Sequence, residues 1–188
     1  GGWRSSEGWL LDRHGEALQR QRVDATVRRL DWVALEDMSP ALRAAAVLSE
    51  DRRFYDHAGV DWQAVAGASF RRLFDQQARG ASTLTMQLAG LIDADLRRGS
   101  GGRSLAQKVD QAWIATRIEA GWRKHQILEA YLNLAPFRGE LVGVDAAAQQ
   151  LFGKQPVGLD ITESAILAVL LRAPNASPDA VGRRACAL

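Results

Sequence analysis

Two short stretches of this chain bring together side chains that can exchange protons or bind an anion. Residues 50–61 hold neighbouring carboxylates, a histidine and aromatic residues, which are types used in acid–base work. Residues 80–87 begin with a Gly-Ala-Ser-Thr turn and continue with a helical pattern. Backbone N–H groups at a helix start, together with two hydroxyls, suit a phosphate. The two stretches predict an enzyme that acts on a ligand with an anionic group.

Glu50 is the candidate general base. At the C-terminal end of a buried helix its carboxylate meets the negative end of the helix dipole, and Asp51 adds a second negative charge. Both effects, with desolvation, favour the protonated form and predict a raised pKa, as a base working near neutral pH requires. The alternative is an exposed glutamate paired with Arg43 or Arg53, which spacing alone favours because most glutamates are exposed.

The other polar residues of the two stretches also fit ordinary structural roles. His57 can orient a carboxylate or bond a backbone carbonyl, and Phe54 is most simply a core residue. Ser82 or Thr83 can serve as a plain helix N-cap. These residues alone therefore leave the choice between a functional and a structural role open.

Further polar residues recur at helical spacings in the second half of the chain. Lys108 and Gln111 lie one turn apart and are expected to share a helix face. Lys124, Glu129 and Asn133 follow at similar spacings. A solvated charged stripe explains both sets as well as a binding site does.

The elements that must hold these residues are mainly helical. A hairpin is predicted from residues 9–12 and 17–19, and a short strand from 27–30. Helices are predicted over residues 40–50, 62–77, 83–92, 104–120, 123–133, 144–152 and 162–173. Ser82 or Thr83 is expected to cap the third, Ser104 the fourth and Thr162 the last. The glycine-rich basic segment 93–103 is expected to be a mobile loop.

Composition excludes several classes of protein. The chain has 188 residues, 47% hydrophobic and 24% charged, which fits one globular domain, and its net charge of +2 does not favour nucleic acid as a partner. The single cysteine, Cys186, excludes an internal disulfide and a CxxC metal site. No apolar run approaches the roughly 20 residues that span a bilayer. Because the chain begins with Gly1, we expect a piece of a longer protein, with any membrane anchor before it.

Four ordered motifs resemble those of the family 51 glycosyltransferases, the peptidoglycan polymerases. They are Glu50-Asp51-x-x-Phe54-x-x-His57-x-Gly59, Gly80-x-Ser82-Thr83-x-Thr85-x-Gln87, Lys124-x-x-Ile127-Leu128-Glu129-x-Tyr131-x-Asn133, and Thr162-Glu163 with the segment that ends in Arg172-Ala173-Pro174. The third family motif departs from its usual Arg-Lys-x-x-Glu, since this chain has Gln107-Lys108-Val109-Asp110-Gln111. That departure is most like the penicillin-binding protein 1C branch.

The resemblance implies a mainly α, lysozyme-like, two-lobed domain over residues 39–188, with residues 1–38 as a hairpin-like lead-in. Full relatives carry a transpeptidase domain after this region, which we do not expect within these 188 residues. The implied activity is polymerisation of lipid II into β-1,4-linked glycan strands, with inversion and release of undecaprenyl diphosphate. Glu50 is implied as the general base. Substrate binding is implied for Asp51, Phe54, His57, Gly80, Ser82, Thr83, Gln87, Lys108, Gln111, Lys124 and Glu129.

The implied partners are lipid II, the nascent glycan strand, other cell-wall synthesis proteins and the bacterial inner membrane at its periplasmic face, with no nucleic acid. No metal ligand is predicted, because Gln111 stands where the family has a glutamate. We therefore expect Lys108 to neutralise diphosphate charge and a divalent cation, Mg or Mn, to be optional. The alternatives are a non-catalytic module that binds glycan or lipid II, and a lysozyme-like enzyme that cleaves glycan.

Overall fold

The chain forms two compact units. The structure, a computed structural model, describes residues 3–72, 82–93 and 105–188. Unit 1 comprises Gly1–Ser49 and Leu132–Leu188, and unit 2 is the continuous segment Glu50–Tyr131. In sequence, unit 2 is thus an insertion into unit 1. The predicted functional division at residue 38 stays a prediction.

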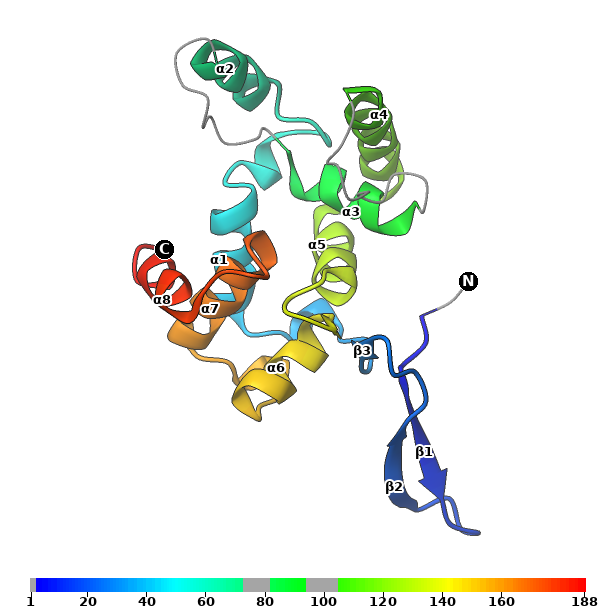
Figure 1. The fold of residues 1–188 in the computed structure, drawn as a ribbon. Coiled ribbons are helices and arrows are strands. Elements are labelled where there is room, and N and C mark those ends of the chain that lie inside the picture. Colours follow the sequence, from blue (N-terminus) through cyan, green and yellow to red (C-terminus); the bar gives the residue numbers. More distant parts are fainter. Residues whose placement is uncertain (1–2, 73–81, 94–104) are drawn as a thin grey trace. The chain divides into compact units, whose positions relative to one another are not determined.

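Unit 1 begins with a hairpin and a pair of very short strands. Strands β1 (Glu7–Leu11) and β2 (Ala17–Arg22) pair antiparallel. β3 (Arg28–Arg29) pairs parallel with β4 (Leu141–Val142), so the N-terminal segment is held by a partner from the second half of the chain. Figure 1 shows β3 between the hairpin and the helices of unit 1. The predicted hairpin and third strand are confirmed.

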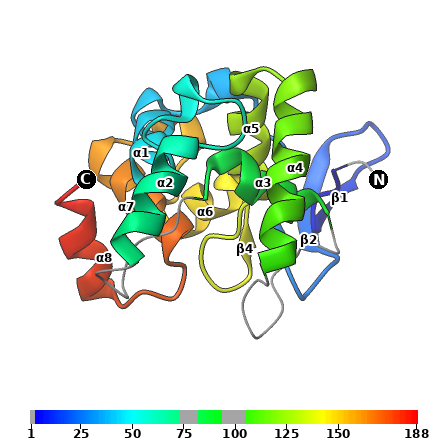
Figure 2. The same ribbon diagram turned by 90° about the horizontal axis from the view of Figure 1, so that it is seen from above.

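The helices of unit 1 bury an aliphatic core. They are η1 (Leu35–Asp37), α1 (Pro40–Glu50, whose last residue opens unit 2), α6 (Val144–Phe152), η3 (Pro156–Gly158), α7 (Ile161–Arg172) and α8 (Pro178–Ala185). Helices α7 and α8 lie side by side in both ribbon views (Figures 1 and 2). Asn133 ties the lead-in to this unit, because its amide bonds both the backbone N–H and the carbonyl of Val33, at 2.9 and 2.8 Å.

Unit 2 carries most of the residues singled out by the sequence. Its elements are η2 (Phe54–Asp56), α2 (Trp62–Arg72), α3 (Leu84–Ile92), α4 (Leu105–Gly121) and α5 (Lys124–Leu134, most of which lies in this unit). A core cluster of Val60, Met86 and Ala115 joins the loop before α2 to α3 and α4. Gly59 allows this close approach: its φ is +90°, and an added Cβ would lie 2.8 Å from the backbone of Ala115.

The mainly α fold with its hairpin lead-in is confirmed, and two expectations are corrected. The N-cap of α7 is Asp160 rather than Thr162, because Asp160 and Glu163 form a reciprocal capping box. Helix α8, capped by Ser177, was not predicted at all. The expected cap at Ser104 and the expected mobile loop, from residue 94 onward, lie outside the described residues.

Candidate active site

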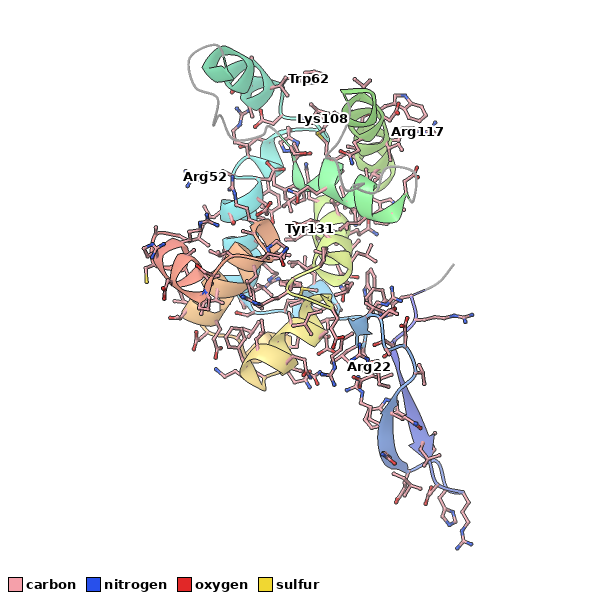
Figure 3. All side chains as sticks on the ribbon, in the orientation of Figure 1. Arg22, Arg52, Trp62, Lys108, Arg117 and Tyr131 are labelled. Carbon is pink, nitrogen blue, oxygen red and sulfur yellow. The ribbon has the colours of Figure 1, made fainter. Side chains whose placement is uncertain are left out.

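Glu50 ends α1, as the sequence predicted, and its carboxylate is held by a chain of side chains from two other helices. Gln87 on α3 donates a hydrogen bond from Nε2 to Oε2 of Glu50, at 3.0 Å. The hydroxyl of Tyr131 on α5, labelled in Figure 3, donates to Oε1 of the same Gln87 at 3.1 Å. The candidate base is therefore oriented by Gln87, which is itself oriented by Tyr131.

Tyr131 is a neutral donor in this chain of contacts. Its side chain is fully buried on the apolar face of α5, beside Ile127 and Leu128. Burial, and secondly the negative charge of Glu50, raises the pKa of the Tyr131 hydroxyl well above its usual range. The phenol therefore keeps its proton throughout the pH range in which a carboxylate base works.

Asp51 occupies the helix start that was expected to receive a phosphate. Its buried carboxylate accepts the backbone N–H of Leu84, the first residue of α3, at 3.0 Å. It also accepts a hydrogen bond from Nε2 of His57, at 3.0 Å. A carboxylate is favoured at a helix N-terminus for the same electrostatic reason as a phosphate. The chain thus supplies its own anion for the Leu84 N–H, whereas the predicted anion-binding role of residues 80–83 stays a prediction.

The hydroxyl of Thr83 is committed to the fold as well. It accepts the backbone N–H of Met86 at 3.1 Å, which makes Thr83 the cap of α3, and it donates to the carbonyl of Gly59 at 2.5 Å. Thr83 is almost fully buried, whereas its neighbour Ser82 is partly exposed. Of the two hydroxyls expected to meet a diphosphate, Ser82 is therefore the accessible one.

An open pocket of about 220 Å³ lies within unit 2, and Glu50 is on its wall. Its lining consists of Glu50, Asp51, Arg52, Arg53, Asp61, Ala64, Ser82 and Thr83. Asp61 caps α2 by accepting the N–H of Ala64 at 2.9 Å and lies 3.6 Å from the guanidinium of Arg53. The pocket thus combines a candidate base with two guanidinium groups and a hydroxyl. Glu50 can deprotonate a hydroxyl here, while Asp51 and Asp61 offset the charges of the two guanidinium groups.

Lys124 holds the first motif to the end of α4. Its Nζ donates to the carbonyl of His57 at 2.6 Å and to Oε1 of Glu119 at 2.7 Å. The same ammonium lies 4.4 Å from the centre of the Phe54 ring. Glu119 also accepts from Oγ1 of Thr85, at 2.6 Å. In the structure, Lys124 and Phe54 thus support the segment that carries Asp51 and His57.

The two residues singled out in the third motif, Lys108 and Gln111, both lie in α4 but differ in burial. Gln111 is fully buried in unit 2, whereas Lys108 is exposed on α4. Figure 3 shows Lys108 and Arg117 leaving α4 on opposite sides, as residues about half a turn out of phase must. Glu129 is half-buried, and Gly80 lies outside the described residues.

Across the described ranges, no three His, Cys, Asp or Glu side chains are grouped as metal ligands would be.

Sequence reasoning missed the partners that position the named residues. Tyr131 reads as one more apolar position of α5, and nothing in its spacing connects it with Gln87. Glu119 precedes the break between α4 and α5 and has no periodic relation to Lys124. Arg52 and Arg53 follow the Glu50-Asp51 pair directly, and their place beside a candidate base is the one signal that could have marked them as part of a site.

Comparison with known proteins gives a consistent family. A sequence model described as "Transglycosylase" matches residues 14–188. The chain is 39% identical over 166 residues to the biosynthetic peptidoglycan transglycosylase of Aeromonas hydrophila subsp. hydrophila, covering 88% of this chain and 67% of that protein. It is 41% identical over 146 residues to the protein of the same name from Rhodospirillum centenum, covering 77% of this chain and 60% of that protein.

A longer protein also matches. The chain is 41% identical over 144 residues to penicillin-binding protein 1C of Escherichia coli (strain K12), covering 76% of this chain but 18% of that protein. The chain therefore spans about two thirds or less of the length of these relatives.

Proposed function

Because the chain belongs to the transglycosylase family, we propose that it is a peptidoglycan glycosyltransferase that polymerises lipid II into β-1,4-linked glycan strands. The observation that supports this most directly is the placement of Glu50. Its carboxylate is oriented by Gln87 and lies on the wall of an open pocket that also holds Arg52 and Ser82. A base beside cationic and hydroxyl groups matches a reaction that activates an alcohol and expels a diphosphate.

In the proposed reaction, the 4-hydroxyl of the acceptor sugar attacks the anomeric carbon of the donor. Glu50 takes the hydroxyl proton as the new glycosidic bond forms. The bond between the anomeric carbon and the diphosphate breaks, so undecaprenyl diphosphate leaves and the configuration inverts. Glu50 must be ionised to accept the proton, which makes the reaction depend on the protonation state of this one carboxyl.

The departing diphosphate needs positive charge and hydrogen-bond donors. Arg52, Arg53 and Ser82 line the pocket with Glu50, and Lys108 is an exposed cation on α4. Magnesium sites usually use one or two carboxylates together with substrate phosphates. Gln111 is a neutral amide and is buried, so it is no such ligand. We therefore assign neutralisation of the diphosphate charge to Arg52, Arg53 and Lys108, with Ser82 as a hydrogen-bond donor, and treat a divalent cation as optional.

The proposed substrate also sets the proposed location. Lipid II carries an undecaprenyl chain, so the enzyme would work at the periplasmic face of the inner membrane, with the nascent glycan strand and other cell-wall synthesis proteins as partners. None of the helices within the described residues has the length and apolar content needed to span a bilayer.

Glu50→Gln tests the assignment. This substitution keeps the size of the side chain and its contact with Gln87 but removes the basic oxygen. We expect glycan polymerisation from purified lipid II in detergent to fall by about 10²–10⁴-fold with the circular dichroism spectrum unchanged, because that is the usual contribution of a general base. Glu36→Gln, at an exposed position in η1, is the matched control and should keep full activity.

The products separate this function from its alternatives. A polymerase releases undecaprenyl diphosphate and makes longer strands, a glycan-cleaving enzyme shortens preformed strands, and a binding module does neither. Wild-type turnover in Glu50→Gln would show that another group is the base.

A further inference from the structure

We propose that Tyr131 is a positioning residue which, through the amide of Gln87, keeps the Glu50 carboxylate ionised and fixed in direction. This inference rests on the proposed role of Glu50 as the base. It concerns a residue that touches neither the carboxylate nor the pocket, and its effect passes through one intermediate side chain.

The argument starts from the two ends of the Gln87 side chain. An amide has an acceptor oxygen and a donor nitrogen, whereas an ionised carboxylate only accepts. The contact with Glu50 therefore needs the amide nitrogen, which lies 3.0 Å from Oε2 of Glu50. The Tyr131 hydroxyl donates to the amide oxygen at 3.1 Å and so stabilises the rotamer that presents the nitrogen to Glu50. The Glu50 carboxylate and the Tyr131 hydroxyl thus hold the amide in the same orientation from its two ends, and removing the hydroxyl leaves only the carboxylate to fix it.

The position of Tyr131 makes this stabilisation effective. The ring is buried to 2% exposure, so it cannot swing away into solvent. Its hydroxyl remains protonated, because burial and the nearby Glu50 charge raise its pKa. A hydrogen bond that is donated to the charged form of an acid favours that form, so the Tyr131–Gln87 pair lowers the pKa of Glu50 relative to a site without it.

Other charged groups near Glu50 stay the same when only the tyrosine hydroxyl is removed. The pocket that Glu50 lines also holds Asp51, Arg52 and Arg53 on the following loop and Asp61 at the start of α2. Titration of these groups would shift the pKa of Glu50 equally in the wild-type protein and in the variant. Their influence therefore cancels in a comparison of the wild-type protein with Tyr131→Phe.

Tyr131→Phe keeps the buried ring and removes only the hydroxyl. In a ¹³C NMR titration of labelled glutamate carboxyls, with Glu50 assigned by its absence in Glu50→Gln, we expect the Glu50 pKa to rise by about half to one unit. On the acid side of the pH–rate profile, the polymerisation rate of the variant should fall at a pH higher by the same amount. At high pH the rate should recover to within about twofold of wild type. The chain's other tyrosine, Tyr55, is exposed, so Tyr55→Phe is the matched control and should change neither.

The route through Gln87 is tested by a double-mutant cycle. Gln87→Leu removes the donor itself and should raise the Glu50 pKa at least as much as Tyr131→Phe does. In the Gln87→Leu background, Tyr131→Phe should then add almost nothing. Additive shifts would mean that Tyr131 acts on Glu50 by another path, and this would overturn the proposal.

A purely structural role for Tyr131 gives a different result. In that case Tyr131→Phe would lower the rate by the same factor at every pH, or lower stability, with the Glu50 titration unmoved. The NMR measurement also separates the positioning role of Tyr131 from the proposed function of the protein. A shifted Glu50 pKa in Tyr131→Phe, with no polymerisation by the wild-type protein, would contradict the proposed function and leave the positioning role intact.

Discussion

Replacing Lys124 by methionine is expected to destabilise unit 2, because it leaves a buried carboxylate without its cation. Lys124 meets Glu119, the carbonyl of His57 and the ring of Phe54. The side chains of Lys124 and Glu119 are 22% and 7% exposed, so the pair is largely withdrawn from water. Methionine keeps the apolar stem of the lysine and removes only the charge and the donors.

The size of the effect follows from these contacts. Removing one partner of a buried ion pair costs about 3–5 kcal/mol, and a lost cation–π contact adds about 0.5–2 kcal/mol. The hydroxyl of Thr85 still donates to Glu119 after the change, and Lys124 is partly solvated in the native state. Both facts reduce the loss, so we expect the free energy of unfolding to fall by about 3 kcal/mol.

Urea denaturation of the single and double variants is the assay. Glu119→Gln keeps an acceptor for Thr85 and removes the stranded charge, so Lys124→Met with Glu119→Gln should recover about half of the loss. Lys108→Met, an exposed lysine of α4, is the control and should stay within about 0.5 kcal/mol of wild type. A loss under about 1 kcal/mol in Lys124→Met, or no recovery in the double variant, would refute the assigned role of this pair.

Of two further changes, one is expected to lower stability and the other to lower activity while leaving stability unchanged. Gly59→Ala should cost about 2–3 kcal/mol in urea denaturation, because its φ is +90° and the added Cβ meets the Ala115 backbone at 2.8 Å. Gly121→Ala, with nothing near its Cβ, should cost nothing, and equal effects would contradict this reasoning. Lys108→Ala should reduce lipid II polymerisation at least about tenfold with an unchanged melting temperature, whereas EDTA should change the wild-type rate less than about twofold. Loss of activity in EDTA that magnesium restores would show that a metal carries the charge instead.

The local parts of the fold were predictable because their signals lie close together in the chain. Ser39-Pro40 marked the start of α1, and the helix end at Glu50 followed from the apolar run before it. The same logic failed at α7, where the N-cap is Asp160, two residues before the expected Thr162, in a capping box with Glu163. Helix α8 opens with a Ser-Pro pair like that of α1, but Val181 is its one buried residue within the described chain, so no apolar periodicity marked it.

The candidate site was predictable in its centre and not in its surroundings. The position of Glu50 at a helix end is a local property. Its orientation depends on Gln87 and Tyr131, which come from two later helices and meet only in the folded unit. The helix cap at Thr83 was likewise identified, but no local pattern shows that Asp51, 33 residues before Leu84, accepts the first N–H of the helix. Long-range partners of this kind are set by tertiary packing, which propensity and spacing do not encode.

The discontinuity of unit 1 has a consequence for the newly made chain on the ribosome. β3 at Arg28–Arg29 pairs with β4 at Leu141–Val142, and Val33 is tied to Asn133, so these parts of the lead-in lack their partners until the second half emerges. At bacterial synthesis rates that wait lasts roughly 5–20 s. Unit 2 is continuous in sequence and can fold during this interval. Trp9, Leu10, Leu11 and Leu18 of the hairpin are exposed even in the folded protein. The N-terminal segment with the hairpin and β3 is therefore the part of the nascent chain that most needs a chaperone or a nearby surface.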